Sequence, residues 1–155
     1  MEKYLVGVQV DGDWPVDAEA VRQTGIAVLI HQDVTAAEVA LVISSDETLR
    51  ELNRRFRNVD SATDVLAFAD DTRGPYAVGG DQVPYLGDVV ISFPRAEEQS
   101  AQAGHSVLAE LQLLVVHGML HLLGFDDQEQ SKRSEMWAVQ AAVIAALGIE
   151  VNLPD

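Results

Sequence analysis

The stretch HGMLHLLGFDD, residues 117–127, decides how this chain folds around its candidate site. His117 and His121 are four residues apart, so on a helix they stand on one face, one turn above the other. Gly124 is the residue type expected just past the end of such a helix, where a left-handed backbone carries no side-chain penalty. The stretch therefore predicts a helix that ends in a glycine bend, and this bend returns Asp127 over the face that carries the histidines.

Two imidazoles and one carboxylate form the ligand set of a catalytic metal site. Zinc takes four ligands in tetrahedral geometry, and three protein ligands leave one position open. The alternative is an amphipathic core helix whose histidines bond backbone carbonyls. Gly118 argues against it, because a glycine inside a helix costs about 1 kcal/mol relative to alanine and indicates a close approach to the backbone. We therefore predict that His117, His121 and Asp127 bind one metal ion, Zn²⁺.

The same residues match the spacing H-x-x-x-H-x-x-G-x-x-H of the metzincin peptidases, with aspartate at the last position. Those peptidases carry their catalytic glutamate directly after the first histidine, where this chain has Gly118. A zinc-dependent hydrolase of another bond, chiefly a metzincin-like peptidase lacking the usual Glu, stays open as an alternative. The missing glutamate is the feature against it.

The length and composition limit which classes of protein this chain can belong to. The 155 residues, 48% of them hydrophobic, are enough for a single domain, residues 1–155, with a sizeable core. Without cysteine, imidazole and oxygen must coordinate any ion. No stretch of about 18 uninterrupted apolar residues occurs, and no cationic leader precedes a long apolar run. We therefore expect a cytoplasmic protein whose partners include neither a membrane nor a small-molecule cofactor.

The net charge of -15 argues against nonspecific binding to polyanions, because Lys and Arg supply the affinity for phosphates. Four of the ten Lys and Arg residues nevertheless fall within residues 50–57. Arg50, Arg54 and Arg57 recur at helical spacing and form one stripe if this segment is a helix. The stripe is either a local phosphate-facing surface or, the interpretation that we favour, a solvated helix face paired with nearby acids.

The order of elements predicts an α+β fold, with one mixed sheet of about four strands and helices packed on its faces. Alternating or β-branched segments predict strands at Tyr4–Val10, Glu38–Ile43, Thr63–Phe68 and Leu86–Phe93. Capping residues and glycine stops predict helices at Asp17–His31, Ser45–Arg57 and Pro94–Ala103, then one from Ser106 through the two histidines, and a last one at Gln128–Leu147. Between the last two strands, Asp70–Pro84 reads as a mobile surface loop.

Several side chains have predicted positions within this arrangement. In the second helix, Leu49, Leu52 and Phe56 face inward and the arginine stripe faces outward. Ser44-x-x-Glu47 provides its capping signal. His31 and His105 are expected at the surface. Trp14 and Trp137 lack interleaved basic residues, which favours core or anchor roles over base stacking.

Four ordered motifs, LNRRFR at 52–57, TDVLAF at 63–68, LGDVVIS at 86–92 and HGMLHLLGFDD, resemble those of the YbeY family of bacterial endoribonucleases. The resemblance implies one catalytic zinc in a single α+β domain. It also implies single-strand-specific cleavage in 16S rRNA 3′-end maturation and ribosome quality control. The expected partner is ribosomal RNA on the small ribosomal subunit, with ribosomal proteins or an assembly GTPase as further partners.

The resemblance also assigns roles to residues. His117 and His121 match two metal-binding histidines of the family, and Asp127 stands where the third would be. The family's important arginine falls on Arg57, and its second-shell acid falls on Asp126, which we expect to accept a hydrogen bond from a ligand histidine. Aspartate is an ordinary zinc ligand, so we expect the site to survive, with other divalent ions such as manganese more competitive.

The expected reaction is metal-assisted hydrolysis of a phosphodiester. The ion acidifies a bound water and polarises a phosphoryl oxygen, with His117 and Arg57 as the catalytic residues. Arg57 would hold the phosphate through its planar fork of donors. Besides the peptidase variant, a noncatalytic ribosome-assembly factor that uses the metal only to fix the helix end stays open.

Overall fold

In the part of the chain that the structure describes, four strands form one mixed sheet, in the order β1-β2-β4-β3. The structure is a computed structural model that describes residues 3–69 and 83–152. The strands are β1 (Tyr4–Val10), β2 (Ala37–Ser44), β3 (Val65–Ala69) and β4 (Tyr85–Ser92). The first three in the sheet are parallel, and β3 lies antiparallel to β4 at one edge. The predicted mixed sheet and the single α+β domain are confirmed, whereas most of the predicted loop at Asp70–Pro84 lies outside the described residues.

Within the described residues, five helices accompany the sheet: α1 (Ala18–His31), α2 (Asp46–Arg57), α3 (Phe93–Ala103), α4 (Val107–Leu122) and α5 (Gln130–Ala146). Four of them begin at a residue whose side chain accepts a backbone N–H in the first turn, and these caps are Asp17, Ser45, Ser92 and Ser106. The predicted caps Asp17 and Ser106 are confirmed. The cap of α2 is Ser45, one residue beyond the Ser44 of the predicted capping signal, because Ser45 rather than Ser44 accepts from the Thr48 backbone.

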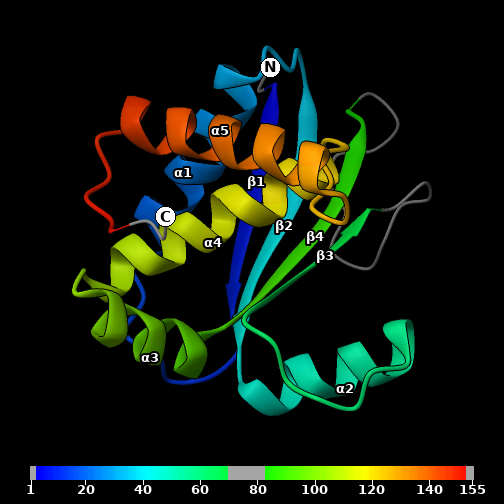
Figure 1. Ribbon diagram of the computed structural model, residues 1–155, viewed down its shortest axis with the longest axis vertical. Coiled ribbons are helices and arrows are strands. Elements are labelled where there is room, and N and C mark those ends of the chain that lie inside the picture. Colours follow the sequence, from blue (N-terminus) through cyan, green and yellow to red (C-terminus); the bar gives the residue numbers. More distant parts are fainter. Residues whose placement is uncertain (1–2, 70–82, 153–155) are drawn as a thin grey trace.

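The helices cover both faces of the sheet (Figure 1). The main core lies where α1 and α4 pack on one face, with α3 and α5 outside them. On the other face α2 closes a smaller apolar cluster, in which Leu49 packs with Val42, Leu66 and Val90. Strand β2 is buried along its whole length because both clusters press on it.

A sharp bend separates α3 from α4. Gly104 ends α3 with a positive φ of 80°, and its N–H bonds the carbonyl of Ser100. The two helices are bent by 113° at this break. In the part of the chain that the structure describes, no single helix is long and apolar enough to cross a membrane, and α3 and α4 meet that length and composition only as this bent pair.

One predicted core residue is not in the core. Phe56 is 61% exposed, although it was expected to face inward with Leu49 and Leu52. Its ring stands edge-on to Phe68, 5.4 Å between centroids, and the Arg55 guanidinium lies 5.4 Å from the Phe56 centroid. The prediction fails because Phe56 lies in the last turn of α2, where contact with the Phe68 ring of β3 leaves most of its surface exposed.

Gly118 is a point of close approach between α4 and the sheet. A Cβ atom at this position would lie 2.5 Å from Cγ1 of Val89 on β4 and 3.4 Å from Cγ2 of Val65 on β3. Val89 is fully buried and branched at Cβ, so it has little freedom to move away. The backbone approach that a glycine inside a helix predicts is therefore made by the sheet.

We predict that Gly118→Ala lowers the free energy of unfolding by about 1–2 kcal/mol. Overpacking of this kind costs about 1–3 kcal/mol, which outweighs the gain of up to about 1 kcal/mol from replacing glycine inside a helix. Urea unfolding measures the change. Gly7→Ala is the control, because nothing lies within 4 Å of a Cβ there. Val89→Ala should restore part of the loss in Gly118→Ala, and an unchanged or raised stability of Gly118→Ala would contradict this packing.

Candidate metal centre and its cleft

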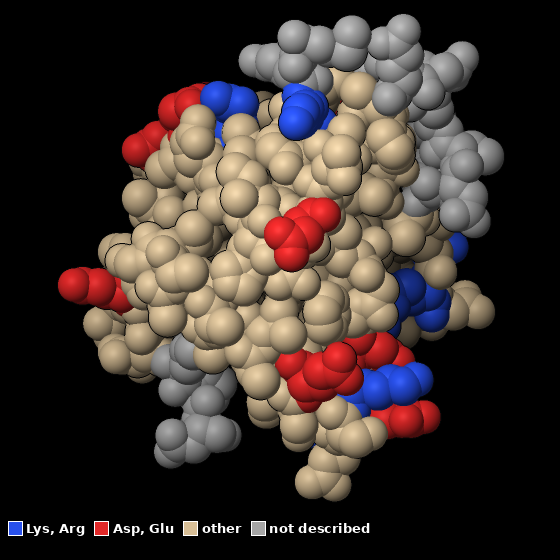
Figure 2. Space-filling view, turned by 90° about the horizontal axis from the view of Figure 1, so that it is seen from above, with Lys and Arg blue, Asp and Glu red and all other residues tan. Residues whose placement is uncertain are grey.

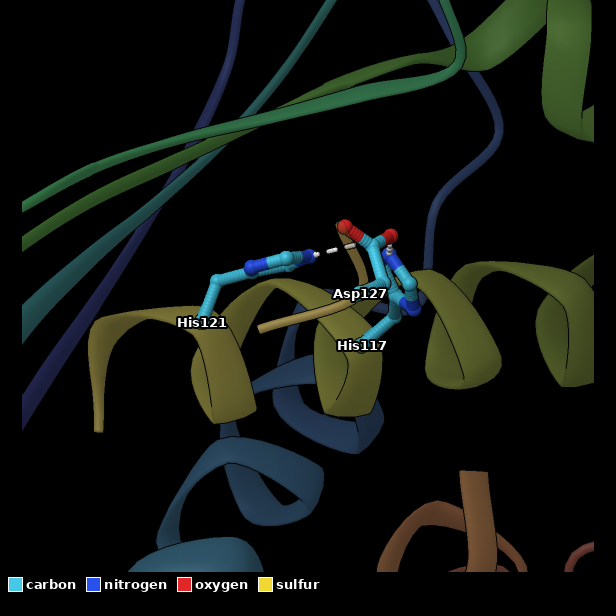
Figure 3. A group of neighbouring side chains, drawn as sticks. All are labelled: His117, His121 and Asp127. Atoms are coloured by element: carbon cyan, nitrogen blue, oxygen red, sulfur yellow. Dashed lines mark ion pairs between the residues drawn. The ribbon is translucent and has the colours of Figure 1, made fainter. Parts of the chain in front are cut away.

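Two histidines of α4 point their rings to the same side of the helix (Figure 3). The ring centroids of His117 and His121 are 4.8 Å apart, and the ring planes are inclined by 73°. This arrangement follows from the four-residue spacing, which places both side chains on one helix face. It confirms the predicted pairing of the two imidazoles.

The glycine bend brings the third residue to this pair. Gly124 has φ of 99°, its N–H bonds the carbonyl of His121, and the next N–H, of Phe125, bonds the carbonyl of Leu120. These bonds close the end of α4 in the manner expected for a glycine after a helix. The backbone carbonyl of Asp127 then accepts a hydrogen bond from Nε of Arg133 on α5, which holds the returning chain in place.

The carboxylate of Asp127 lies between the two rings. Its Oδ2 is 3.9 Å from Nε2 of His117 and 3.6 Å from Nε2 of His121. Ligands about 2.1 Å from a tetrahedral zinc are roughly 3.4 Å from one another, so these separations fit one ion with only small side-chain rotations. Over residues 3–69 and 83–152, these three side chains form the one group of three such ligands that are close enough for a shared ion.

Gln140 of α5 sets the tautomer of His117. Its Oε1 lies 2.9 Å from Nδ1 of His117, and an amide oxygen can only accept, so Nδ1 carries the hydrogen. The lone pair of Nε2 then faces Asp127, as metal binding requires. Asp126, which we expected in this role, instead accepts from the backbone N–H of Gln128 and caps the turn. The prediction for Asp126 is therefore wrong.

The pKa of His121 is lowered from its ordinary value. Burial is the first cause, because it disfavours the charged ring, and the neighbouring His117 is the second. The carboxylates of Asp127 and Asp126 act in the opposite direction and are outweighed. Near neutral pH the ring of His121 is thus uncharged, which leaves a lone pair available for an ion.

A cleft of about 450 Å³ opens over the three side chains, between α4 and β3. Arg57, at the end of α2, lines this cleft together with His117, His121 and Asp127. The buried Asn53 supports this end of α2. Its side-chain amide donates to the carbonyl of Ser61, and its backbone carbonyl accepts a hydrogen bond from the N–H of Val59. Arg57 and the three candidate ligands, which are distant in sequence, therefore share one cavity.

The arginine stripe divides into paired and unpaired members. Arg50 bonds Asp60 at 2.8 Å, and Arg54 bonds Glu51 at 2.7 Å. Arg57 makes no ion pair with any residue that the structure describes. At Arg50 and Arg54 the stripe is thus a helix face paired with nearby acids, and the idea of a continuous phosphate-facing surface is wrong for these two residues.

Asp64 is a cleft residue that the sequence analysis did not single out. It follows Thr63 at the start of the TDVLAF motif, and its Oδ2 accepts a hydrogen bond from Gln99 at 3.3 Å. The motif drew attention to the segment, but no local pattern distinguishes this carboxylate from other surface acids. No pattern in the sequence indicated a role for Gln140, because it contacts His117 only through the packing of α5 on α4.

Two further predictions are corrected near this site. His105 is buried rather than on the surface, with a side chain only 5% exposed, because it bonds the buried Glu110. Of the core and anchor roles predicted for Trp137, the core role is wrong, because the residue is 46% exposed, with Arg133 over its ring. His31 is exposed, and Trp14 stacks on Phe93 at 5.1 Å, which confirms both predictions.

We predict that Gln140→Leu weakens zinc affinity by about 10- to 100-fold, the usual effect of removing a partner that orients a ligand histidine. The substitution leaves Nδ1 of His117 without its acceptor, so the ring is free to turn or to change tautomer. Competition with a chromogenic chelator measures the affinity. Gln130→Leu, on the same helix but outside the site, is the matched control, and equal affinity in the two variants would remove Gln140 from this role.

Comparisons with known proteins support one family. The family model described as Endoribonuclease YbeY matches residues 15–148. The Endoribonuclease YbeY of Chloroflexus aggregans is 46% identical over 149 residues, which cover 94% of this chain and 97% of the relative. That of Moorella thermoacetica is 46% identical over 118 residues, covering 73% and 74%.

A solved structure has the same fold. The solution structure of TM1509 from Thermotoga maritima superposes with a TM-score of 0.60, at 22% identity, over 90% of this chain and 87% of that one. At this identity the match supports the fold, whereas the family model and the curated relatives establish the membership. From its motifs, its fold and these relatives, the chain belongs to the YbeY family of endoribonucleases.

Proposed function

We propose that this endoribonuclease uses one divalent ion, Zn²⁺ in the first place, to hydrolyse phosphodiesters of single-stranded ribosomal RNA. The observation that carries the proposal is the shared cleft, in which the three candidate ligands lie with an arginine that has no carboxylate partner among the described residues. A phosphate needs both a cation and hydrogen-bond donors as its charge develops, and this cleft offers places for both.

Residues of the chain have separate proposed roles in binding the ion and the substrate phosphate. His117, His121 and Asp127 would hold the ion, and Gln140 keeps His117 in the tautomer that permits this. When bound, the ion supplies an activated water and a Lewis acid for the phosphoryl group. Arg57 binds the same phosphate through its planar guanidinium and orients it in the cleft.

The packing around Gly118 disfavours peptide hydrolysis by the metzincin mechanism. Gly118 lines the cleft, but the Cβ of a glutamate in its place would lie 2.5 Å from Cγ1 of Val89. A peptidase-type general base at this position would therefore clash with the sheet. A noncatalytic role in ribosome assembly finds no support in a family whose relatives are named as endoribonucleases.

The substrate is proposed to be the 3′ region of 16S rRNA, cut in the cytoplasm during ribosome maturation and quality control. Supporting this, the chain is too acidic to hold free RNA well, since its net charge is -15 and two arginines of α2 are neutralised. On the face in Figure 2, described Lys and Arg side chains stand singly or beside carboxylates. RNA presented on the small ribosomal subunit, with ribosomal proteins or an assembly GTPase as docking partners, removes the need for such affinity.

We predict that Arg57→Ala reduces the rate of RNA cleavage by about 100- to 1,000-fold while leaving the metal content unchanged. The loss follows from removing the one donor group that we assign to the phosphate. Cleavage of a labelled single-stranded RNA measures it, with metal content from elemental analysis. Arg54→Ala changes the net charge equally but removes only the pair with Glu51, so it should cleave normally. Loss of metal in Arg57→Ala, or equal losses in both variants, would contradict the assignment.

We predict that Asp127→His raises the preference of the protein for Zn²⁺ over Mn²⁺. A third imidazole replaces a hard oxygen ligand, and nitrogen ligands suit zinc better than manganese. Competitive loading followed by elemental analysis gives the preference. Asp126→His is the control, because the neighbouring carboxylate caps the turn and is not among the three candidate ligands. If only the Asp126 variant changed its preference, or neither did, Asp127 would not be a ligand.

A further inference from the structure

A second cavity adjoins the cleft. It has a volume of about 600 Å³ and is lined by residues of α3, α4 and α5 and by Asn152. His117 and Asp64 line both cavities, so the two openings meet at the candidate metal centre. Its size is within the range of pockets that hold small ligands. A nucleotide chain with its phosphate in the first cavity would have a neighbouring base within reach of the second.

A buried pair of side chains marks this cavity. His105 and Glu110 both line it, with side chains only 5% and 6% exposed. The backbone N–H of Asn152 donates to Nδ1 of His105 at 3.0 Å, so the ring hydrogen must be on Nε2, which lies 2.5 Å from Oε1 of Glu110. His105 is therefore the donor of the pair, and Glu110 is the acceptor.

Glu110 lines the cavity, and its second oxygen is the one left to accept a further hydrogen bond. Oε2 makes no hydrogen bond with any residue that the structure describes. It is not sealed in the core either, because among those residues the one side-chain polar atom that is fully buried and without a partner is Oδ1 of Asn53. A carboxylate that is almost wholly buried thus presents one acceptor to whatever enters.

The rest of the lining suits a flat, uncharged ring with polar edges. Trp137 is 46% exposed and contributes an indole surface. Gln99, Gln102 and Gln140 contribute amides, and the described residues of the lining include carboxylates but neither Lys nor Arg. A phosphate group would meet repulsion here. A nucleobase would find an aromatic surface to stack on and an acceptor for its amino group.

We propose that this cavity binds the nucleobase next to the cleaved phosphate, and that it selects bases with an exocyclic amino group. The amino group donates to Oε2 of Glu110, and the ring lies against Trp137. Uracil has a carbonyl in the place of the amino group of cytosine, so its oxygen would face the carboxylate. The inference rests on the proposed function, because it assigns a specificity subsite to the same RNA-cleaving centre.

The test is nucleoside binding, which does not depend on cleavage. Cytidine and uridine are titrated separately into the ¹⁵N-labelled full-length chain with zinc supplied, and the indole N–H resonances are followed. Trp14→Phe identifies the resonance of Trp137. Cytidine should shift the Trp137 resonance saturably, with an affinity roughly tenfold higher than that of uridine, as expected for one hydrogen bond to a charged acceptor.

Two variants decide between outcomes. Glu110→Gln should abolish most of the preference for cytidine. Trp137→Ala changes an exposed position and should not endanger folding. It should weaken cytidine binding, which is then measured from the resonance of the Gln140 side-chain amide. Trp14→Ala should leave cytidine binding unchanged. The inference would be overturned if the Trp137 resonance showed no saturable shift or if the two nucleosides bound with equal affinity. It would also be overturned if spermidine shifted this resonance more strongly than cytidine. RNA cleavage without nucleoside selectivity would refute only the subsite, and nucleoside binding without RNA cleavage would refute only the proposed function.

Discussion

The contact between Gly118 and Val89 is the constraint on which the site depends. Because Gly118 has no side chain, the backbone of α4 packs directly on the Val89 side chain of β4 and close to Val65 of β3. Because neighbouring helix residues are about 100° apart, the helix face next to this contact carries His117 and His121. The histidines consequently lie at the rim of the sheet, beside β3, where a cleft can form over them.

Local patterns in the sequence predicted the parts of the structure that depend on local interactions. The strands, the helix caps and the bend at Gly124 follow from residues within a few positions of each other, and so does the grouping of His117, His121 and Asp127. Gln140 could not be predicted, because its contact with His117 joins residues 23 positions apart across two packed helices. The burial of His105 was missed for a similar reason, since the Asn152 contact spans 47 positions. Phe56 has an apolar spacing that indicates the core, but it lies in the last turn of α2 and remains largely exposed beside Phe68.

Charge explains how an acidic protein can belong to a family that acts on RNA. The chain neutralises most of its arginine stripe with its own carboxylates and leaves Arg57 over the cleft. The protein therefore lacks the affinity for RNA that many phosphate contacts would provide. It retains one guanidinium, that of Arg57, where the proposed reaction needs it. The neighbouring cavity, which is lined by amides, carboxylates and an exposed indole, suits a base rather than a phosphate. Together the two cavities divide the proposed recognition of RNA into a charged and an uncharged part that meet at His117.

The claim at the centre of this account is that two imidazoles and the carboxylate of Asp127 share one cation. X-ray absorption at the zinc edge, on protein loaded with one equivalent of Zn²⁺, tests it most directly. The account predicts a first shell of nitrogen and oxygen only, with the outer-shell scattering of two imidazoles, and loss of one imidazole in His121→Ala. A protein that takes up no zinc, or an ion whose shell contains no imidazole, would contradict it.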